Sequence, residues 1–188
     1  MERTLGELQQ KALLSRFYLA GGTGLALHLG HRRSHDLEFF SGEEFGEETP
    51  KAPHTLHGAV WGTKVSFLTY PYPVLFPFAT FLGAQVADPR DIAAMKISAL
   101  VSRGTKRDFV DLYAVSMHYG LEQALMLFQR KFIQVSYSQV HVLKSLTYFE
   151  DAEKDPMPEM LAPLSWDEVK RFFTGEALRL AAGGPVLF

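Results

Sequence analysis

The feature that most constrains the fold is a change of pattern at Asp88-Pro89. Aspartate is a favoured helix N-cap and proline is favoured at the first helical position, so we expect a helix from there to about Arg103, where Gly104 ends it. Before this point, short apolar runs are broken by glycine and proline, which is typical of short strands and turns. We therefore expect an α+β fold, with an α+β half over residues 1–88 joined closely to a helical half over residues 89–188.

The spacing of apolar residues, the helix caps and the turn residues predict the individual elements. Helices are expected over residues 4–15, over a short stretch that Thr23 caps and Gly30 ends, and over about 89–103, 106–119, 121–134, 138–153 and 165–183. Strands are expected over 17–20 and 36–40, as a strand or hairpin within 60–70, and as an edge strand over 83–87. Residues 41–55, rich in Gly, Glu, Thr and Pro, are expected to form an exposed, mobile loop.

Composition excludes several classes of protein. The 188 residues are 47% hydrophobic and carry a net charge of −2, which is ordinary for a globular protein and gives no overall basic footprint for nucleic acid. The chain contains no cysteine, which excludes disulfides, thiolate zinc sites and cysteine nucleophiles. No signal peptide is visible, and no apolar run approaches the roughly 20 residues of a membrane span. We therefore expect a cytoplasmic protein with no membrane partner.

A pair of glycines, Gly21-Gly22, follows the first expected strand and precedes a short helix that begins near Thr23. Glycine lets backbone N–H groups approach an anion closely, and a helix N-terminus adds its dipole and its free N–H groups. The pattern favours a phosphate at this bend. On its own, a Gly-Gly-Thr sequence is more often a turn followed by a helix cap.

Two acids, Asp36 and Glu38, lie one residue apart in the second expected strand. Alternate side chains of a strand share a face, so both carboxylates project together while Leu37 and Phe39 face the core. Neighbouring carboxylates repel unless a cation lies between them, and Mg²⁺ binds carboxylate and phosphate oxygens together. The sequence thus predicts a place for the phosphates of a nucleotide with magnesium beside them.

Lys96 is the one charged residue between Ile92 and Ser102 of the expected helix. An ammonium group on an apolar helix must either extend to water or find an anion. Read alone, the helix allows both possibilities.

Two blocks of sequence together resemble the AbiEii/AbiGii-type nucleotidyltransferases, a family of the DNA polymerase β-like superfamily. The first block consists of Tyr18-Leu19-Ala20-Gly21-Gly22-Thr23, Ala26-Leu27-His28, Arg32-Arg33-Ser34 and Asp36-Leu37-Glu38-Phe39-Phe40. The second consists of Asp91-Ile92-Ala93-Ala94-Met95-Lys96-Ile97-Ser98-Ala99-Leu100, Arg103 and Arg107-Asp108-Phe109-Val110-Asp111-Leu112-Tyr113.

The resemblance implies a minimal nucleotidyltransferase-like mixed sheet with flanking helices, and a C-terminal helical bundle that closes the cleft. It implies transfer of a nucleotidyl group from a nucleoside triphosphate with two Mg²⁺ ions, which Asp36 and Glu38 would hold. Many members are toxins with an antitoxin partner, and some relatives modify tRNA, so the expected acceptor is an RNA, with tRNA as one candidate, or a protein hydroxyl.

The resemblance also assigns roles in the second block. Lys96 would point toward the nucleotide phosphates and stabilise the charge that develops there. Asp108 would orient Lys96 or act as a base, and orientation is favoured because an ion pair lowers the basicity of a carboxylate. Asp111, three residues further on, shares a helix face with Asp108, or else forms a salt bridge with Lys106 or Arg107.

A basic cluster precedes Asp36, made of His28, His31, Arg32, Arg33 and His35. One interpretation is a patch that attracts triphosphate or RNA, in which Arg33 contacts the nucleotide together with Gly21, Gly22, Thr23 and Lys96. The other is a solvated loop. A zinc site made by His31, His35 and Asp36 is a less favoured alternative, because its spacing would need a helix.

Two departures from the family pattern leave an alternative open. The second acid is Glu38 where the family usually has aspartate, and residues 64–70, where the superfamily often has a third carboxylate, contain no acid. The leading hypothesis is a magnesium-dependent nucleotidyltransferase. The alternatives are a non-catalytic nucleotide- or RNA-binding module that retains the fold, and an interaction protein bound to an antitoxin-like partner.

Overall fold

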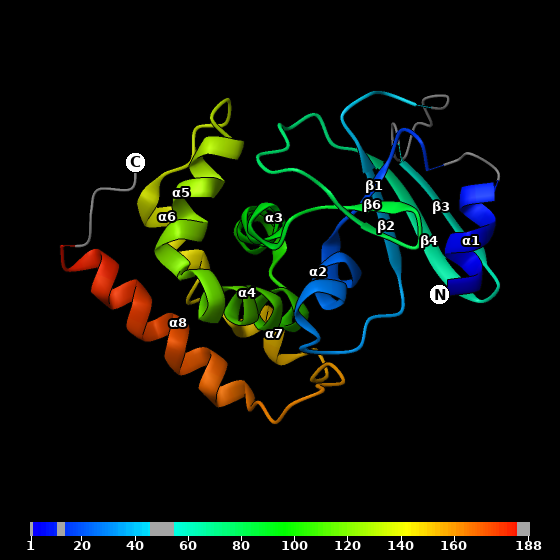
Figure 1. The fold of residues 1–188 in the computed structure, drawn as a ribbon. Helices are drawn as coiled ribbons and strands as arrows, with labels where there is room; N and C mark the ends of the chain where they lie inside the picture. The colour runs from blue at the N-terminus through cyan, green and yellow to red at the C-terminus, as the bar shows by residue number, and fades with distance from the viewer. Residues whose placement is uncertain (1, 11–13, 46–54, 184–188) are drawn as a thin grey trace.

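A computed structural model describes residues 2–10, 14–45 and 55–183 and confirms the α+β class (Figure 1). The strands are β1 (Tyr18–Leu19), β2 (Leu37–Ser41), β3 (Thr55–Val60), β4 (Thr63–Thr69), β5 (Ala79–Phe81) and β6 (Ala84–Val86). The helices are α1 (Glu2–Gln10), α2 (Gly21–Leu29), α3 (Pro89–Arg103), α4 (Lys106–Tyr119), α5 (Leu121–Lys131), α6 (Gln139–Ser145), α7 (Glu150–Glu153) and α8 (Trp166–Ala181). Among the described residues, no helix is long and apolar enough to cross a membrane.

The strands form one mixed sheet in the order β3-β4-β2-β1-β6-β5. In it, β2 runs antiparallel to β1 and parallel to β4, with Glu38 opposite Ser66. The expected edge strand over 83–87 is wrong in its position, because β6 lies between β1 and β5. The edges are β5 and β3. The strand or hairpin expected within 60–70 is the hairpin of β3 and β4, but β3 extends back to Thr55, where four of its six residues are exposed and no apolar alternation predicts a strand.

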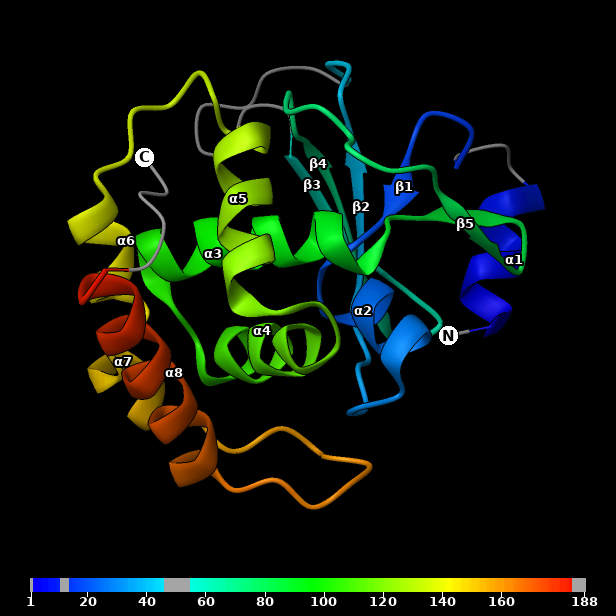
Figure 2. The ribbon, with the colours of Figure 1, turned by 60° about the vertical axis from the view of Figure 1, so that its left-hand side comes forward.

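Side chains of β2 point alternately to two apolar clusters. Leu37 and Phe39 join the side chains of α1, including Leu5 and Leu8, on one face of the sheet. Phe40 faces the larger cluster formed with the other helices. Figures 1 and 2 show this arrangement, with α1 on one side of the sheet and α2 to α8 on the other. The face that carries Phe40 also carries Glu38, which places that carboxylate at the boundary with the helices.

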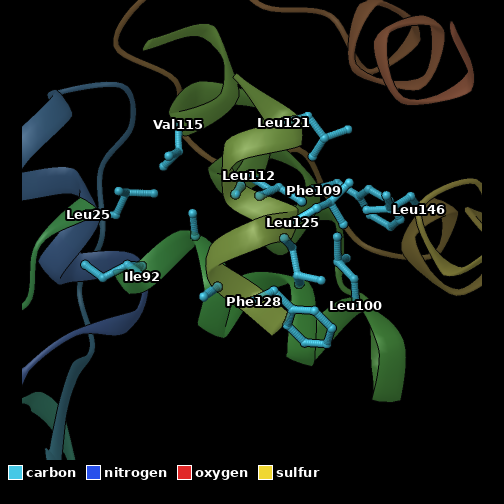
Figure 3. Close-up of a cluster of buried hydrophobic side chains, with 14 of the residues drawn as sticks. Leu25, Ile92, Leu100, Phe109, Leu112, Val115, Leu121, Leu125, Phe128 and Leu146 are labelled. Carbon is cyan, nitrogen blue, oxygen red and sulfur yellow. The ribbon is translucent and has the colours of Figure 1, made fainter. Parts of the chain in front are cut away.

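The larger cluster connects the two halves of the chain. Leu25 of α2 and Phe40 of β2 share it with Ile92 of α3, Phe109 of α4 and Phe128 of α5. All five are at most 8% exposed. Figure 3 shows Leu25, Ile92, Phe109 and Phe128 in this cluster. The two expected halves therefore pack on one another, and the boundary at residue 88 stays a prediction.

Several expected helix boundaries are wrong. The first helix spans Glu2–Gln10, residues 11–13 lie outside the described residues, and 14–16 form a turn. The helix expected over 121–134 ends at Lys131, and that over 138–153 is divided into α6 and α7. Most of the loop expected over 41–55 also lies outside the described residues, and β2 and β3 take its two ends.

The N-terminus of α2 differs from the prediction. The helix begins at Gly21 with Ala20 as its N-cap, so Thr23 lies inside the helix and does not cap it. The Thr23 hydroxyl instead donates to the backbone oxygen of Asp36 and lies 2.8 Å from Ser34 Oγ. Thr23 thereby fixes the chain just before β2. Gly30 ends the helix in the left-handed conformation, as predicted.

A buried ion pair anchors the segment between β4 and β5. Lys131 of α5 is 1% exposed, and its Nζ donates to Asp91 Oδ1 at 2.8 Å and to the Pro73 carbonyl at 2.7 Å. Asp91 of α3 also accepts from the backbone N–H groups of Leu75 and Phe76. Both charges are fully hydrogen-bonded, so this loop is fixed to two helices.

Candidate active site

A pocket of about 400 Å³ lies where the start of β2 and the N-terminus of α2 meet the second half of α3 and the start of α4. It brings together residues from both blocks that the sequence singled out. Its lining consists of Gly22, Arg32, Ser34, Asp36, Glu38, Lys96, Ala99, Ser102, Arg103, Thr105, Arg107 and Asp108.

The glycine pair forms the bend at the start of α2. Gly21 has φ +62°, and a Cβ atom there would collide with the Glu38 carboxylate. A Cβ atom at Gly22 would collide with the Arg32 guanidinium. Both positions therefore need glycine because site side chains pack directly against the backbone. No side chain caps α2, so its first N–H groups stay available to an anion.

Asp36 and Glu38 are half-buried on the pocket wall. Within the described part of the chain, neither side chain accepts a hydrogen bond or forms an ion pair. Two neighbouring carboxylates without a direct partner are a hard oxygen donor set of the kind that Mg²⁺ prefers. Among the described residues no group of three potential metal-ligating side chains occurs, so substrate oxygens and water would have to complete the coordination. With that completion, the donor set fits a magnesium site.

The Lys96 ammonium group forms ion pairs with carboxylates and is largely shielded from water. Its side chain is 10% exposed, and its Nζ lies 2.8 Å from Asp108 Oδ1 and 2.7 Å from Asp111 Oδ2. The other Asp108 oxygen accepts from the Thr105 N–H and hydroxyl, which completes a capping box at the start of α4. The cap of α4 thereby holds Asp108 in place to orient Lys96.

Asp111 is the centre of a network of ion pairs and hydrogen bonds that also includes Lys96. This central role of Asp111 was not predicted from the sequence. It is fully buried, and Arg32 donates to it twice, at 2.6 and 2.9 Å. His31 Nε2 lies 2.8 Å from Asp111 Oδ1. The predicted salt bridge from Asp111 to Lys106 or Arg107 is wrong. The Lys106 ammonium donates to the Asp155 carbonyl instead, and Arg107 lines the pocket.

The network shifts the ionisation of its members. Burial alone would raise the pKa of Asp111, but the charge of Lys96 and the hydrogen bonds from Arg32 and His31 hold that pKa well below its ordinary value. Burial would lower the pKa of Lys96, and the charges of Asp111 and Asp108 overcome this and raise it. The pKa of Asp108 is lowered despite its burial, chiefly by Lys96. All three groups are therefore charged near neutral pH.

We expect stability to fall in acid more steeply for the wild type than for Asp111→Asn. The folded-state pKa of Asp111 lies below the unfolded value of 3.8, so its contribution is complete above that value and is lost as the pH falls below it. Urea midpoints at about pH 7 and about pH 3 measure the difference. An equal fall in both proteins would contradict the prediction.

Of the residues predicted to bind the nucleotide, Gly21, Thr23 and Arg33 are absent from the lining of the pocket. Thr23 is buried behind the bend, and Arg33 is exposed and pairs with Glu159 at 3.1 Å. Arg33 and His35 line a neighbouring hollow, whereas Arg32 enters the pocket itself. The zinc alternative finds no support, because no cluster of three potential ligands occurs in the described ranges.

Two further cations stand at the rim of the pocket. Arg103 ends α3 and Arg107 lies in the first turn of α4, and both are exposed. Neither forms an ion pair within the part of the chain that the structure describes. Unpaired guanidinium groups suit bidentate contacts to phosphate.

Comparisons with known proteins identify the family of the chain. A family profile described as "Nucleotidyl transferase AbiEii toxin, Type IV TA system" matches residues 58–179, which include Lys96, Asp108 and Asp111 and begin after Glu38. An uncharacterized protein of Aquifex aeolicus (strain VF5) is 36% identical over 177 residues, covering 84% of each chain. The crystal structure of a candidate nucleotidyltransferase from H. pylori aligns with a TM-score of 0.49 and 16% identity, covering 100% of this chain and 99% of the other. Since the profile matches more than half of the chain, the protein belongs to the AbiEii nucleotidyl transferase toxin family.

Proposed function

We propose that the chain is a magnesium-dependent nucleotidyltransferase, which moves a nucleoside monophosphate from a nucleoside triphosphate to a hydroxyl of an RNA, tRNA included, or of a protein. The observation that carries the proposal is the meeting in one pocket of Asp36, Glu38, Arg103 and Arg107 with the glycine bend, since these four side chains form no ion pair with any described residue. Carboxylates that lack a cation and arginines that lack an anion together suit a metal–triphosphate complex.

In this proposal the β- and γ-phosphates bind between the glycine bend and the arginines at the rim of the pocket. The N–H group of Gly22 at the bend and the guanidinium groups of Arg103 and Arg107 bind the β- and γ-phosphates. Asp36 and Glu38 would hold two Mg²⁺ ions, which when bound polarise the α-phosphate and lower the pKa of the acceptor hydroxyl. The acceptor oxygen then forms a bond to the α-phosphorus, pyrophosphate leaves, and the hydroxyl proton passes to water.

Lys96 contributes a fixed positive charge at the wall of the pocket. Charge that is already in position stabilises negative charge on the phosphates without reorganisation. Asp108 acts as a positioning residue for Lys96, because its lowered pKa makes it a weak base.

A non-catalytic nucleotide- or RNA-binding module is the second candidate. The observation in its favour is the residue opposite Glu38 in β4, which is Ser66, with no acid elsewhere in residues 63–69 of that strand. Two carboxylates, one of them on a longer arm, would then bind a nucleotide without turning it over. Because the family consists of toxins of toxin–antitoxin systems, we also propose an antitoxin protein as a partner.

Transfer of label distinguishes the two candidates. The protein is incubated with Mg²⁺, bulk tRNA or a protein extract, and each nucleoside triphosphate labelled at the α- or the γ-phosphate. We expect α-label and not γ-label to reach an acceptor, and a chelator to prevent it. Nucleotide binding without transfer to any acceptor would favour the binding module, and absence of nucleotide binding would contradict both candidates.

A further inference from the structure

A second hollow, of about 260 Å³, opens from the pocket between the sheet and α3. The two share Glu38, Lys96, Ala99, Ser102 and Asp108. The walls that belong to the second hollow alone are Gly21, Phe40, Tyr70, Met95 and Ser98, and we call this hollow the side slot. It adjoins the pocket at Glu38, which is one of the carboxylates that would hold metal.

The side slot has two apolar walls and a few hydroxyl groups. Met95, Ser98 and Ser102 lie on one stripe of α3, three to four residues apart. Facing them, the rings of Phe40 and Tyr70 meet edge to face with centroids 5.4 Å apart. A space between a thioether and aromatic rings suits a flat, polarizable group.

Hydroxyl groups in the side slot still have free hydrogen-bonding capacity. The Ser98 hydroxyl makes no hydrogen bond within the described ranges. Ser102 Oγ donates to the carbonyls of Ser98 and Ala99, at 3.2 and 3.1 Å, so its lone pairs remain able to accept. Both hydroxyl groups can therefore form hydrogen bonds with the polar edge of a bound ring.

Two other hollows adjoin the pocket, and each combines apolar side chains with charged ones of its own, whereas the charged residues of the side slot are all shared with the pocket. One, toward α6, is lined by His141, Lys144 and Asp151 as well as by Leu100, Val101 and Tyr148. The other contains Arg107, Asp155 and Glu159. A planar heteroaromatic ring gains most where its faces leave water against apolar groups, so the side slot fits it better than either of these.

We propose that the side slot binds the nucleobase of the nucleoside triphosphate, an inference that rests on the proposed function. An α-phosphate bound beside Glu38 carries the β- and γ-phosphates on one side and the nucleoside on the other. Arg103 and Arg107 occupy the pocket and are absent from the side slot, so the phosphates extend toward them and the base enters the slot. Met95, Tyr70 and Ser98 are then the residues that contact the base.

Filling the slot tests this assignment. Dissociation constants are measured with Mg²⁺ and without acceptor for the four ribonucleoside triphosphates and for inorganic tripolyphosphate, which lacks a base. The wild type is expected to bind its preferred nucleotide roughly tenfold or more tightly than tripolyphosphate, the scale of one stacked base. Met95→Trp fills the slot and should remove this advantage while tripolyphosphate binding stays the same. Met117→Trp, at an exposed methionine of α4, is the matched control and should retain the advantage.

A second variant guards against a simple folding defect. Ser98→Phe narrows the slot from the next turn of α3 and should act like Met95→Trp, with thermal unfolding confirming that both variants fold. Retention of the nucleotide advantage in both variants, or loss of tripolyphosphate binding in both, would overturn the assignment. A wild type that binds nucleotides no better than tripolyphosphate overturns the slot alone, whereas one that binds neither overturns the proposed function and the slot together.

Discussion

Asp36→Asn is expected to reduce nucleotidyl transfer by roughly three orders of magnitude while leaving the free energy of unfolding unchanged or slightly raised. The Asp36 side chain makes no hydrogen bond or ion pair in the described residues, so the native fold loses no contact when its charge is removed. Its neighbour Glu38 is also freed from repulsion. The proposed metal site, in contrast, loses one of its two protein carboxylates.

The measurement combines a transfer assay with a thermal unfolding curve on the same preparation. Asp167→Asn is the matched control, since that carboxylate is exposed on α8 and its ion pair among the described residues is with another surface side chain, Lys170. Full transfer activity in Asp36→Asn would remove Asp36 from the catalytic centre.

Asp111→Ala is expected to have the largest effect on stability, about 3–5 kcal/mol. It leaves the buried cations Arg32 and Lys96 with one carboxylate, Asp108, in place of two, and of these two cations Asp108 forms an ion pair with Lys96 and not with Arg32 in the described residues. An unpaired buried guanidinium is costly because it has lost its hydration and gains nothing in return. For a chain of this size the melting temperature should fall by roughly 10 °C.

Denaturant unfolding at neutral pH measures this effect. Asp151→Ala is the control, because its ion pair with Lys154 is at the surface and should contribute less than about 1 kcal/mol. If both variants lose the same small amount, the buried network does not stabilise the fold. Comparing Asp111 with Asp36 then separates an acid that holds the pocket together from one that acts in it.

Local signals in the sequence predicted the helical elements that frame the pocket. Both ends of α3 were predicted from Asp88, Pro89 and Gly104. An N-cap aspartate, a proline at the first helical position and a glycine at the C-terminal end each act within one turn of the helix. Alternation along Leu37 and Phe39 correctly placed Glu38 on the opposite face of the strand, but it did not show that this face packs against the helices. Each of these inferences depends only on neighbours in the chain.

Long-range pairings could not be predicted in the same way. Arg32 and Asp111 are 79 residues apart, and no spacing rule joins them. Lys106 or Arg107, on the same helix, was instead offered from the sequence as the salt-bridge partner of Asp111. Nucleotide binding was likewise assigned to Arg33 rather than to Arg32. In the structure the bend at Gly22 leaves room for the Arg32 side chain, and that packing decides which arginine turns inward.

The buried Lys131–Asp91 pair has a consequence for recognition. It fixes the segment that follows Tyr70 through the Pro73 carbonyl and the N–H groups of Leu75 and Phe76. Tyr70 itself donates its N–H to the Ser41 carbonyl at 2.7 Å. Hydrogen bonds thus hold the Tyr70 wall of the side slot in place before a ligand binds. The binding of a base there, as proposed, would therefore cost little conformational entropy of the protein. Selectivity between bases of different shape would come from the preformed shape of the slot rather than from its adaptation to the ligand.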